Sequence, residues 1–179
     1  MSRAATEREL IDSGGLHSAL VRLAGEIAEE LKDAGQVFLA GIPTRGINLA
    51  ARLTGELEQQ GFACRQGAVD ISMYRDDLGL REGVTPLQDT ELPIDIDNWN
   101  VVLVDDVQHT GRTARAAIDA VLAFGRPRRI LYAALVDRGG RELPVRPDFT
   151  GIALSVEPGS RVRVRLAETD DGAEGVYES

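Results

Sequence analysis

Apolar residues recur along this chain with two spacings, which predict alternating helices and strands. From Leu16 to Leu31 they recur every three or four positions, which is typical of a helix with one buried face, and Gly35 follows its end. Shorter segments rich in apolar residues predict strands buried on both faces of a sheet. These segments are Val37–Ala40, Val69–Met73, Val101–Val104 and Ile130–Val136.

Two further helices are predicted after strands. The first ends at Gly61 and the second covers residues 113–124. The first would bury one face through Ile47, Ala50, Leu53 and Leu57. Strands that alternate with helices favour an α/β fold, a parallel-sheet core flanked by helices. Near the C-terminus we expect short edge strands at Ile152–Val156, Val162–Leu166 and Val176–Tyr177.

Residues 74–100 break this pattern. Charges, prolines and glycines crowd the stretch, and neither the helical nor the strand spacing persists. A long segment of this kind inside a compact domain is more often a functional loop or hairpin than a linker. We therefore expect one domain over residues 1–179, with a small hood and flexible loop over residues 74–100.

The composition is that of a soluble globular protein, with 43% hydrophobic and 27% charged residues. The formal net charge of −9 opposes nonspecific binding to polyanions but leaves room for a local basic face. The single cysteine, Cys64, excludes an internal disulfide and a cysteine zinc cluster, and indicates a structural thiol. No signal peptide or membrane-spanning run is predicted, so we expect a cytoplasmic protein without a membrane partner.

The segment from Val101 to Thr113 carries the clearest chemistry. A buried strand ends in two adjacent carboxylates, Asp105 and Asp106, and a Thr-Gly-Arg-Thr turn then opens a helix. Backbone N–H groups at a helix N-terminus bind phosphate, and Gly111 lets the backbone come close to it. The carboxylates would repel that phosphate unless they hold hydroxyls or a Mg²⁺ ion. A doubly wound protein with an acidic strand end and a capped helix would show a similar pattern.

Three further polar loops follow predicted strands and would lie at the same sheet edge, where ligands bind in open α/β sheets. The first is Pro43–Gly46, in which Arg45 offers a guanidinium suited to phosphate oxygens. The second is Ser72–Leu78, which carries Arg75 and an acidic pair that would also fit a solvated charge run. The third is Asp137–Pro144.

Together these loops resemble the signature of the type I phosphoribosyltransferases, which bind 5-phosphoribosyl-1-pyrophosphate (PRPP). The resemblance implies the fold of that family, with a small hood and a flexible loop. It implies that Asp105 and Asp106 contact the ribose hydroxyls, directly or through the cofactor Mg²⁺. The following loop would cradle the 5′-phosphate with Val107, Gln108, His109, Thr110, Gly111, Arg112 and Thr113.

The same resemblance assigns the other loops. Thr44, Arg45 and Gly46 would hold the pyrophosphate, and Arg75 would join them once the mobile loop closes over PRPP. Backbone groups near Val136 and Asp137 would read the nucleobase. The residues implied in catalysis are therefore Asp105, Asp106, Arg45 and Arg75.

Longer matches point to one subfamily. Residues 41–46, 70–78, 102–107, 125–130 and 136–144 together resemble bacterial bifunctional proteins that regulate pyrimidine operons and act as uracil phosphoribosyltransferases. The resemblance implies that uracil and PRPP give UMP and pyrophosphate. It also implies UMP-dependent binding to the mRNA leader of a pyrimidine operon, and a homo-oligomer, either a dimer or a hexamer.

The implied RNA-binding residues are Arg22, Arg141 and Arg146, which we expect on one face away from the PRPP pocket. Relatives usually carry His at the position of Gly140, and a hydroxyl and an imidazole at those of Val21 and Gly25. Each lost phosphate contact removes one counterion-release contribution, so we expect weaker RNA binding than in the relatives.

Two other functions fit the same residues. One is a purine-salvage phosphoribosyltransferase of the same fold, and the other is a regulator that senses nucleotides without catalysis. Neither histidine is expected to act as an acid or base, because His17 would lie at a helix surface and His109 would line the phosphate loop. At Gln108 and His109 relatives usually carry an apolar residue and an aromatic one.

Overall fold

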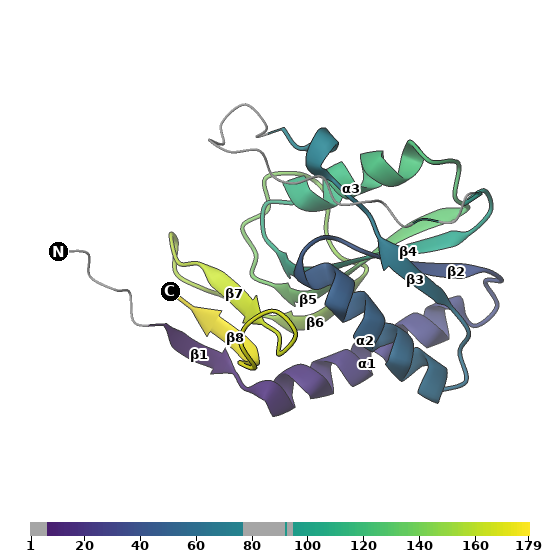
Figure 1. The fold of residues 1–179 in the computed structure, drawn as a ribbon. Helices are drawn as coiled ribbons and strands as arrows, with labels where there is room; N and C mark the ends of the chain where they lie inside the picture. Colours follow the sequence, from purple (N-terminus) through teal and green to yellow (C-terminus); the bar gives the residue numbers. More distant parts are fainter. Residues whose placement is uncertain (1–6, 77–91, 93–94) are drawn as a thin grey trace.

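Five parallel strands form the main sheet of the computed structural model, which describes residues 7–76, 92 and 95–179 (Figure 1). Their order across the sheet is β3-β2-β4-β5-β6, and every neighbouring pair is parallel. Their bounds are β2 Val37–Gly41, β3 Arg65–Ala68, β4 Asn100–Gln108, β5 Arg129–Asp137 and β6 Phe149–Ala153. The predicted α/β fold with a parallel core is confirmed.

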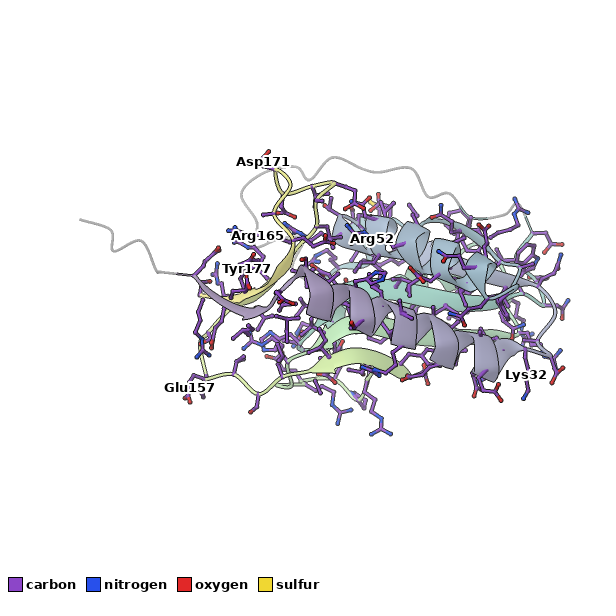
Figure 2. All side chains as sticks on the ribbon, turned by 90° about the horizontal axis from the view of Figure 1, so that it is seen from below. Lys32, Arg52, Glu157, Arg165, Asp171 and Tyr177 are labelled. Atoms are coloured by element: carbon purple, nitrogen blue, oxygen red, sulfur yellow. The ribbon has the colours of Figure 1, made fainter. Side chains whose placement is uncertain are left out.

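Helices cover both faces of this sheet (Figure 1). Helices α1 (Ser13–Leu31) and α2 (Arg45–Gln59) pack side by side on one face, and Figure 2 shows them in front of the sheet. Helix α3 (Arg112–Leu122) and the short 3₁₀ helix η1 (Ser72–Tyr74) lie on the other face. Each face has its own hydrophobic cluster. The predicted helices are thus confirmed, with ends that differ by up to three residues from the predicted ones, since α1 begins at Ser13 rather than at Leu16.

A second, antiparallel sheet joins the two ends of the chain. Its order is β1-β8-β7, with β1 Arg8–Ile11, β7 Val162–Arg165 and β8 Gly175–Glu178. The edge strand predicted at Val162–Leu166 is confirmed by β7. The edge strand predicted at Ile152–Val156 is β6, which begins three residues earlier at Phe149. The prediction is wrong for β8, which is the central strand of the small sheet. The apolar pattern missed β1 because the strand is short and its partner comes from the far end of the chain.

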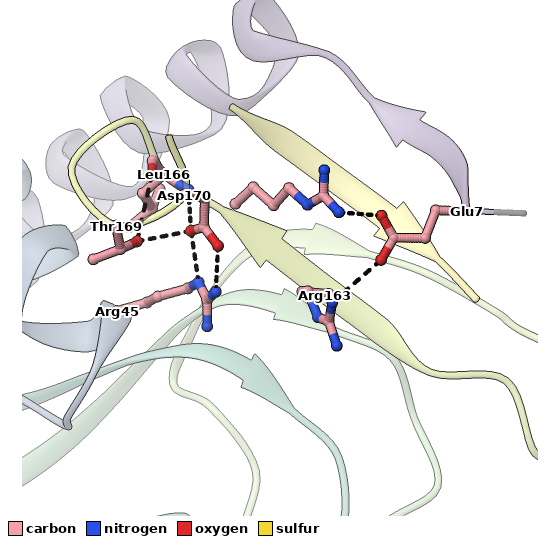
Figure 3. A network of polar contacts seen from close by, with 7 residues as sticks. Glu7, Arg45, Arg163, Leu166, Thr169 and Asp170 are labelled. Carbon is pink, nitrogen blue, oxygen red and sulfur yellow. Dashed lines mark hydrogen bonds and ion pairs between the residues drawn. The ribbon is translucent and has the colours of Figure 1, made fainter. Parts of the chain in front are cut away.

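The small sheet is tied to the rest of the molecule by packing and by charge. Its apolar residues Val164 and Val176 belong to the same cluster as α1 and α2. At its rim Glu7 accepts hydrogen bonds from Arg163, at 3.2 Å, and from Arg165 (Figure 3).

The strand predicted at Val69–Met73 is wrong. The strand lies just before it, at Arg65–Ala68, and pairs only with β2. An edge strand needs little apolar surface, and Arg65 is indeed exposed. Beyond it the Asp70 carboxylate accepts hydrogen bonds from the Ser72 N–H and hydroxyl, which turns the chain into η1.

Most of the predicted hood and flexible loop, residues 74–100, falls outside the described residues, so that assignment and the single-domain boundary stay predictions. At the end of this stretch Ile96 and Trp99 are buried in the α3 cluster, and Trp99 meets Phe38 edge to face with 6.3 Å between ring centroids. Within the described ranges, no helix has the length and apolar character needed to cross a membrane.

Candidate active site

The predicted PRPP-binding residues gather at the carboxyl edge of the main sheet, because the parallel strands all end there. The set comprises Thr44, Arg45 and Gly46 at the start of α2, Asp105 to Gln108 at the end of β4, and residues 109–113, which join β4 to the first residues of α3. In the sheet register Val107 pairs with Val136, and Gln108 pairs with Asp137. The two predicted base-reading residues therefore lie beside the phosphate loop.

The predicted pyrophosphate loop packs directly on the residue that precedes the acidic pair. The Ile42 N–H donates a 2.9 Å hydrogen bond to the Val104 carbonyl. A Cβ added at Gly46 would lie against that same carbonyl oxygen, closer than real Cβ atoms approach. Glycine is therefore required at this position for steric reasons, and its absence of a side chain brings the loop next to Asp105 and Asp106.

Asp105 is buried at the end of β4, with only 5% of its surface exposed. The Tyr132 hydroxyl lies 3.4 Å from Asp105 Oδ2 and 3.0 Å from Gln108 Oε1. Burial, and then the charge of Asp106, raise the pKa of the Asp105 carboxyl well above its ordinary value. Asp106 is less buried.

The phosphate loop ends in a left-handed glycine. Gly111 has φ +90° at the N-cap of α3 and has no side chain to cap the helix, while the Arg112 N–H donates a 3.3 Å hydrogen bond to the Thr110 hydroxyl. The loop is clamped from outside, since the Thr110 carbonyl accepts hydrogen bonds from the N–H groups of Glu142 (2.9 Å) and Leu143 (3.0 Å). An uncapped helix N-terminus in a rigid loop is suited to an anion.

Arg112 places its side chain at the outside of this loop. It forms ion pairs with Glu142, at 2.9 Å, and with Asp76. These pairs raise the pKa of Arg112. Arg75 directly follows η1 and precedes Asp76, so the start of the predicted mobile loop reaches the phosphate loop. The rest of that loop lies outside the described residues.

A cavity of about 510 Å³ opens beside the phosphate loop. Its lining is His109, Arg138, Gly139, Gly140, Val156 and residues 158–161. Arg138 Nη1 donates a 2.6 Å hydrogen bond to the Ser160 carbonyl. Its Nε is buried and has no hydrogen-bond partner among the described residues. Neither of the two predicted base-reading residues is part of this lining: Val136 is fully buried, and Asp137 directly precedes the lining residue Arg138.

Sequence reasoning missed most of this cavity. Arg138 follows Asp137 and could have been included with it in the same loop. Val156 and residues 158–161 could not have been predicted as lining residues, because only the tertiary fold brings them to the end of β5. His109 and Gly140 are in contact, since a Cβ on Gly140 would lie 3.0 Å from the His109 imidazole. Partial burial, and then the charge of Arg138, lower the pKa of His109.

The three predicted RNA-binding arginines are all exposed. Arg22 on α1 donates to Glu26 (2.7 Å) and to backbone carbonyls of β6. Arg141 and Arg146 lie in the loop between β5 and β6. The structure thus does not bury any of them, and their role stays a prediction.

Comparison with known proteins agrees with this arrangement. The sequence pattern of the phosphoribosyl transferase domain matches residues 9–161. A protein of Roseiflexus sp. (strain RS-1) named "Bifunctional protein PyrR" is 45% identical over 172 residues, which are 96% of this chain and 94% of the relative. A protein of the same name from Chloroflexus aurantiacus is 47% identical over 165 residues, 92% of this chain and 91% of the relative.

The fold also matches a solved structure. The hypoxanthine phosphoribosyltransferase of Trypanosoma cruzi superposes with a TM-score of 0.73, covering 96% of this chain and 95% of that one at 18% identity. This identity supports the fold alone. The family pattern covers most of the chain and the PyrR relatives cover nearly all of it. The chain therefore belongs to the phosphoribosyl transferase domain family, and within it to the bifunctional PyrR proteins.

Proposed function

We propose that this phosphoribosyltransferase transfers the phosphoribosyl group of PRPP to uracil, giving UMP and pyrophosphate. The observation that carries the proposal is the meeting of three features at one sheet edge. These are the Gly46 loop packed on β4, the acidic end of β4, and the uncapped start of α3. Each suits one part of PRPP, namely the pyrophosphate, the ribose and the 5′-phosphate.

In this proposal the protein acts mainly by positioning. The backbone N–H groups at the start of α3 hold the 5′-phosphate, while Asp105 and Asp106 orient the ribose hydroxyls. Arg45 and, after loop closure, Arg75 stabilise the charge that develops on pyrophosphate as its bond to the ribose breaks. The relatives named bifunctional protein PyrR support uracil as the acceptor.

The donor set fits Mg²⁺. This ion prefers one or two carboxylates together with substrate phosphate oxygens over a cage made by protein alone. Asp105 and Asp106 supply two carboxylates, and within the described residues no group of three or more His, Cys, Asp or Glu could hold a metal by itself. When bound, the ion would neutralise charge on pyrophosphate and ribose oxygens.

We assign the nucleobase to the 510 Å³ cavity. Its size lies in the range of small-molecule sites, which is about 300–1,000 Å³. Arg138 and His109, which line this cavity, are polar residues suited to the edge of a base. Purines are larger than uracil, and this cavity volume does not by itself exclude them.

A ligand panel separates the candidate substrates. We expect UMP and PRPP to raise the melting temperature of the protein, with IMP and GMP giving smaller shifts, and we expect turnover of PRPP with uracil. Turnover with hypoxanthine or guanine in place of uracil would favour purine salvage. Nucleotide binding without any turnover would favour a regulator that only senses nucleotides.

We also propose that the protein binds the mRNA leader of a pyrimidine operon when UMP is bound, as a dimer or hexamer. The exposed Arg22, Arg141 and Arg146 are the observation that favours this second function, together with the name of the relatives. Because the net charge is −9, binding must depend on local basic side chains rather than on the whole surface.

A further inference from the structure

Arg45 is held by a carboxylate from the far end of the chain. Its Nε donates to Asp170 Oδ2 at 3.1 Å, and its Nη2 donates to Asp170 Oδ1 at 2.6 Å (Figure 3). Asp170 lies in the turn between β7 and β8, 125 positions away in sequence. The pair is a two-point contact between the small sheet and the proposed pyrophosphate loop.

The Asp170 carboxylate is itself held by hydrogen bonds from its own turn. Asp170 Oδ2 accepts further hydrogen bonds from the Leu166 N–H, at 3.0 Å, and from the Thr169 hydroxyl, at 2.7 Å (Figure 3). The backbone of the turn closes with bonds from the Asp170 N–H to the Leu166 carbonyl and from the Ala173 N–H to the Asp170 carbonyl. The carboxylate therefore has little freedom to move.

This pairing leaves one nitrogen of Arg45 for a ligand. A guanidinium carries five N–H donors, and the two-point contact uses only Nε and Nη2. Nη1 points away from Asp170 in Figure 3, and among the described residues it has no hydrogen-bond partner. The side chain remains 26% exposed. The hydrogen bonds to Asp170 raise the pKa of Arg45, and the nearby charge of Asp106 raises it further.

We propose that Asp170 is a positioning residue for pyrophosphate binding. It holds the Arg45 guanidinium in place beside the acidic pair. Because the side chain is already ordered, Arg45 loses little conformational entropy when its Nη1 binds the pyrophosphate of PRPP. The inference rests on the proposed function, because it takes Arg45 to be a pyrophosphate ligand. The opposite role, in which Asp170 competes with pyrophosphate for Arg45, would make its removal favourable for binding.

The same turn supplies a matched control. Arg52, about two helical turns after Arg45 on α2, forms hydrogen bonds with Glu168 at 2.9 and 2.7 Å and pairs with Glu174. E168Q therefore weakens the attachment of the turn to α2 without touching Arg45. A loss of PRPP binding that D170N and E168Q share would come from weaker attachment of the small sheet to α2. Only the additional loss in D170N measures the positioning of Arg45.

The test measures steady-state kinetics, with melting temperatures recorded for each variant. D170N should raise KM for PRPP about tenfold, the loss expected from one hydrogen bond to a charged group, and leave KM for uracil and kcat within about twofold. E168Q should leave all three parameters within about twofold. T169V, which removes one donor to Asp170, should raise KM for PRPP less than D170N does. It serves as the test if D170N does not fold.

Calorimetry with pyrophosphate separates this inference from the proposed function. D170N should weaken pyrophosphate binding about tenfold while UMP binding stays unchanged, whatever base the wild-type protein accepts. An unchanged or lower KM for PRPP and unchanged pyrophosphate affinity would overturn the positioning role. Absence of turnover with uracil in the wild-type protein would contradict the proposed function and leave the calorimetric test standing.

Discussion

Tyr132 and Asp105 meet inside the main sheet, with 3.4 Å between the Tyr132 hydroxyl and Asp105 Oδ2. The same hydroxyl donates to Gln108 Oε1 at 3.0 Å, and Gln108 Nε2 donates to the carbonyls of His109 and Val145, each at 3.3 Å. One buried chain of polar groups therefore links the proposed ribose-binding carboxylate to the phosphate loop. Since β4 and β5 carry all three side chains, the sheet itself sets their positions.

Removal of the Tyr132 hydroxyl should cost stability. Y132F leaves Gln108 Oε1 buried without its donor, and an unsatisfied buried acceptor costs about 1–3 kcal/mol. We expect the free energy of unfolding in urea to fall by that amount. In the double variant Y132F/Q108L both partners are apolar, so its loss should be smaller than the sum of the two single losses. Additive losses would contradict the link between the two residues.

The hydrogen bonds around Tyr132 are an example of what could not be predicted from the sequence. The alternation of strands and helices and the acidic end of β4 were predicted, because each depends on neighbouring residues. The contacts of Tyr132 with Gln108 and of Arg45 with Asp170 were not predicted, because they depend on how distant elements pack. The same reason explains the missed strand β1. The error at Val69–Met73 arose because β3 is a polar edge strand, while Val69 and Ile71, which follow it, are buried outside that strand and Met73 is exposed.

Arg45 should discriminate between ligands that carry pyrophosphate and one that does not. R45A removes the proposed donor, so calorimetry should show weaker binding of PRPP and pyrophosphate by about tenfold or more, with UMP nearly unchanged. R52A removes the same charge from the same helix and should leave all three affinities within about twofold. Equal weakening of PRPP, pyrophosphate and UMP in R45A would mean that Arg45 only supports the loop.

The Arg45–Asp170 pair should make stability depend on pH. The hydrogen bonds from Arg45 lower the pKa of Asp170 below its ordinary value, so the folded state favours the ionised carboxylate. The ionised Asp170 carboxylate therefore stabilises the folded state at pH values above its pKa in the unfolded chain, which is about 3.9. This stabilisation is lost as the pH falls toward the lower pKa that Asp170 has in the folded protein.

Unfolding measurements at several pH values check this sign. The difference in unfolding free energy between the wild-type protein and D170N should be largest above about pH 5 and should shrink as the pH falls to about 3. A difference that stays constant over this range would show that the Asp170 charge contributes nothing.

RNA binding should be electrostatic and should depend on UMP. In filter-binding assays with the leader of a pyrimidine gene, log K should fall linearly with log salt, and UMP should tighten binding. R146A should reduce the salt slope by about one unit if Arg146 contacts a phosphate, whereas R128A, also exposed but before β5, should not. No binding at about 50 mM salt, with uracil turnover intact, would leave an enzyme without the regulatory role.

The most direct test of the central claim is UMP formation from PRPP and uracil, in the presence of Mg²⁺, by the wild-type protein and by D105N. Asp105 is proposed to orient the ribose, so D105N should fold normally and lose about 100-fold in kcat/KM, or about 2.7 kcal/mol of transition-state stabilisation. D119N, which removes a carboxylate paired with Arg115 on the outer side of α3, should match the wild-type protein. A folded D105N within threefold of the wild-type kcat/KM would contradict the assignment of this sheet edge as the active site.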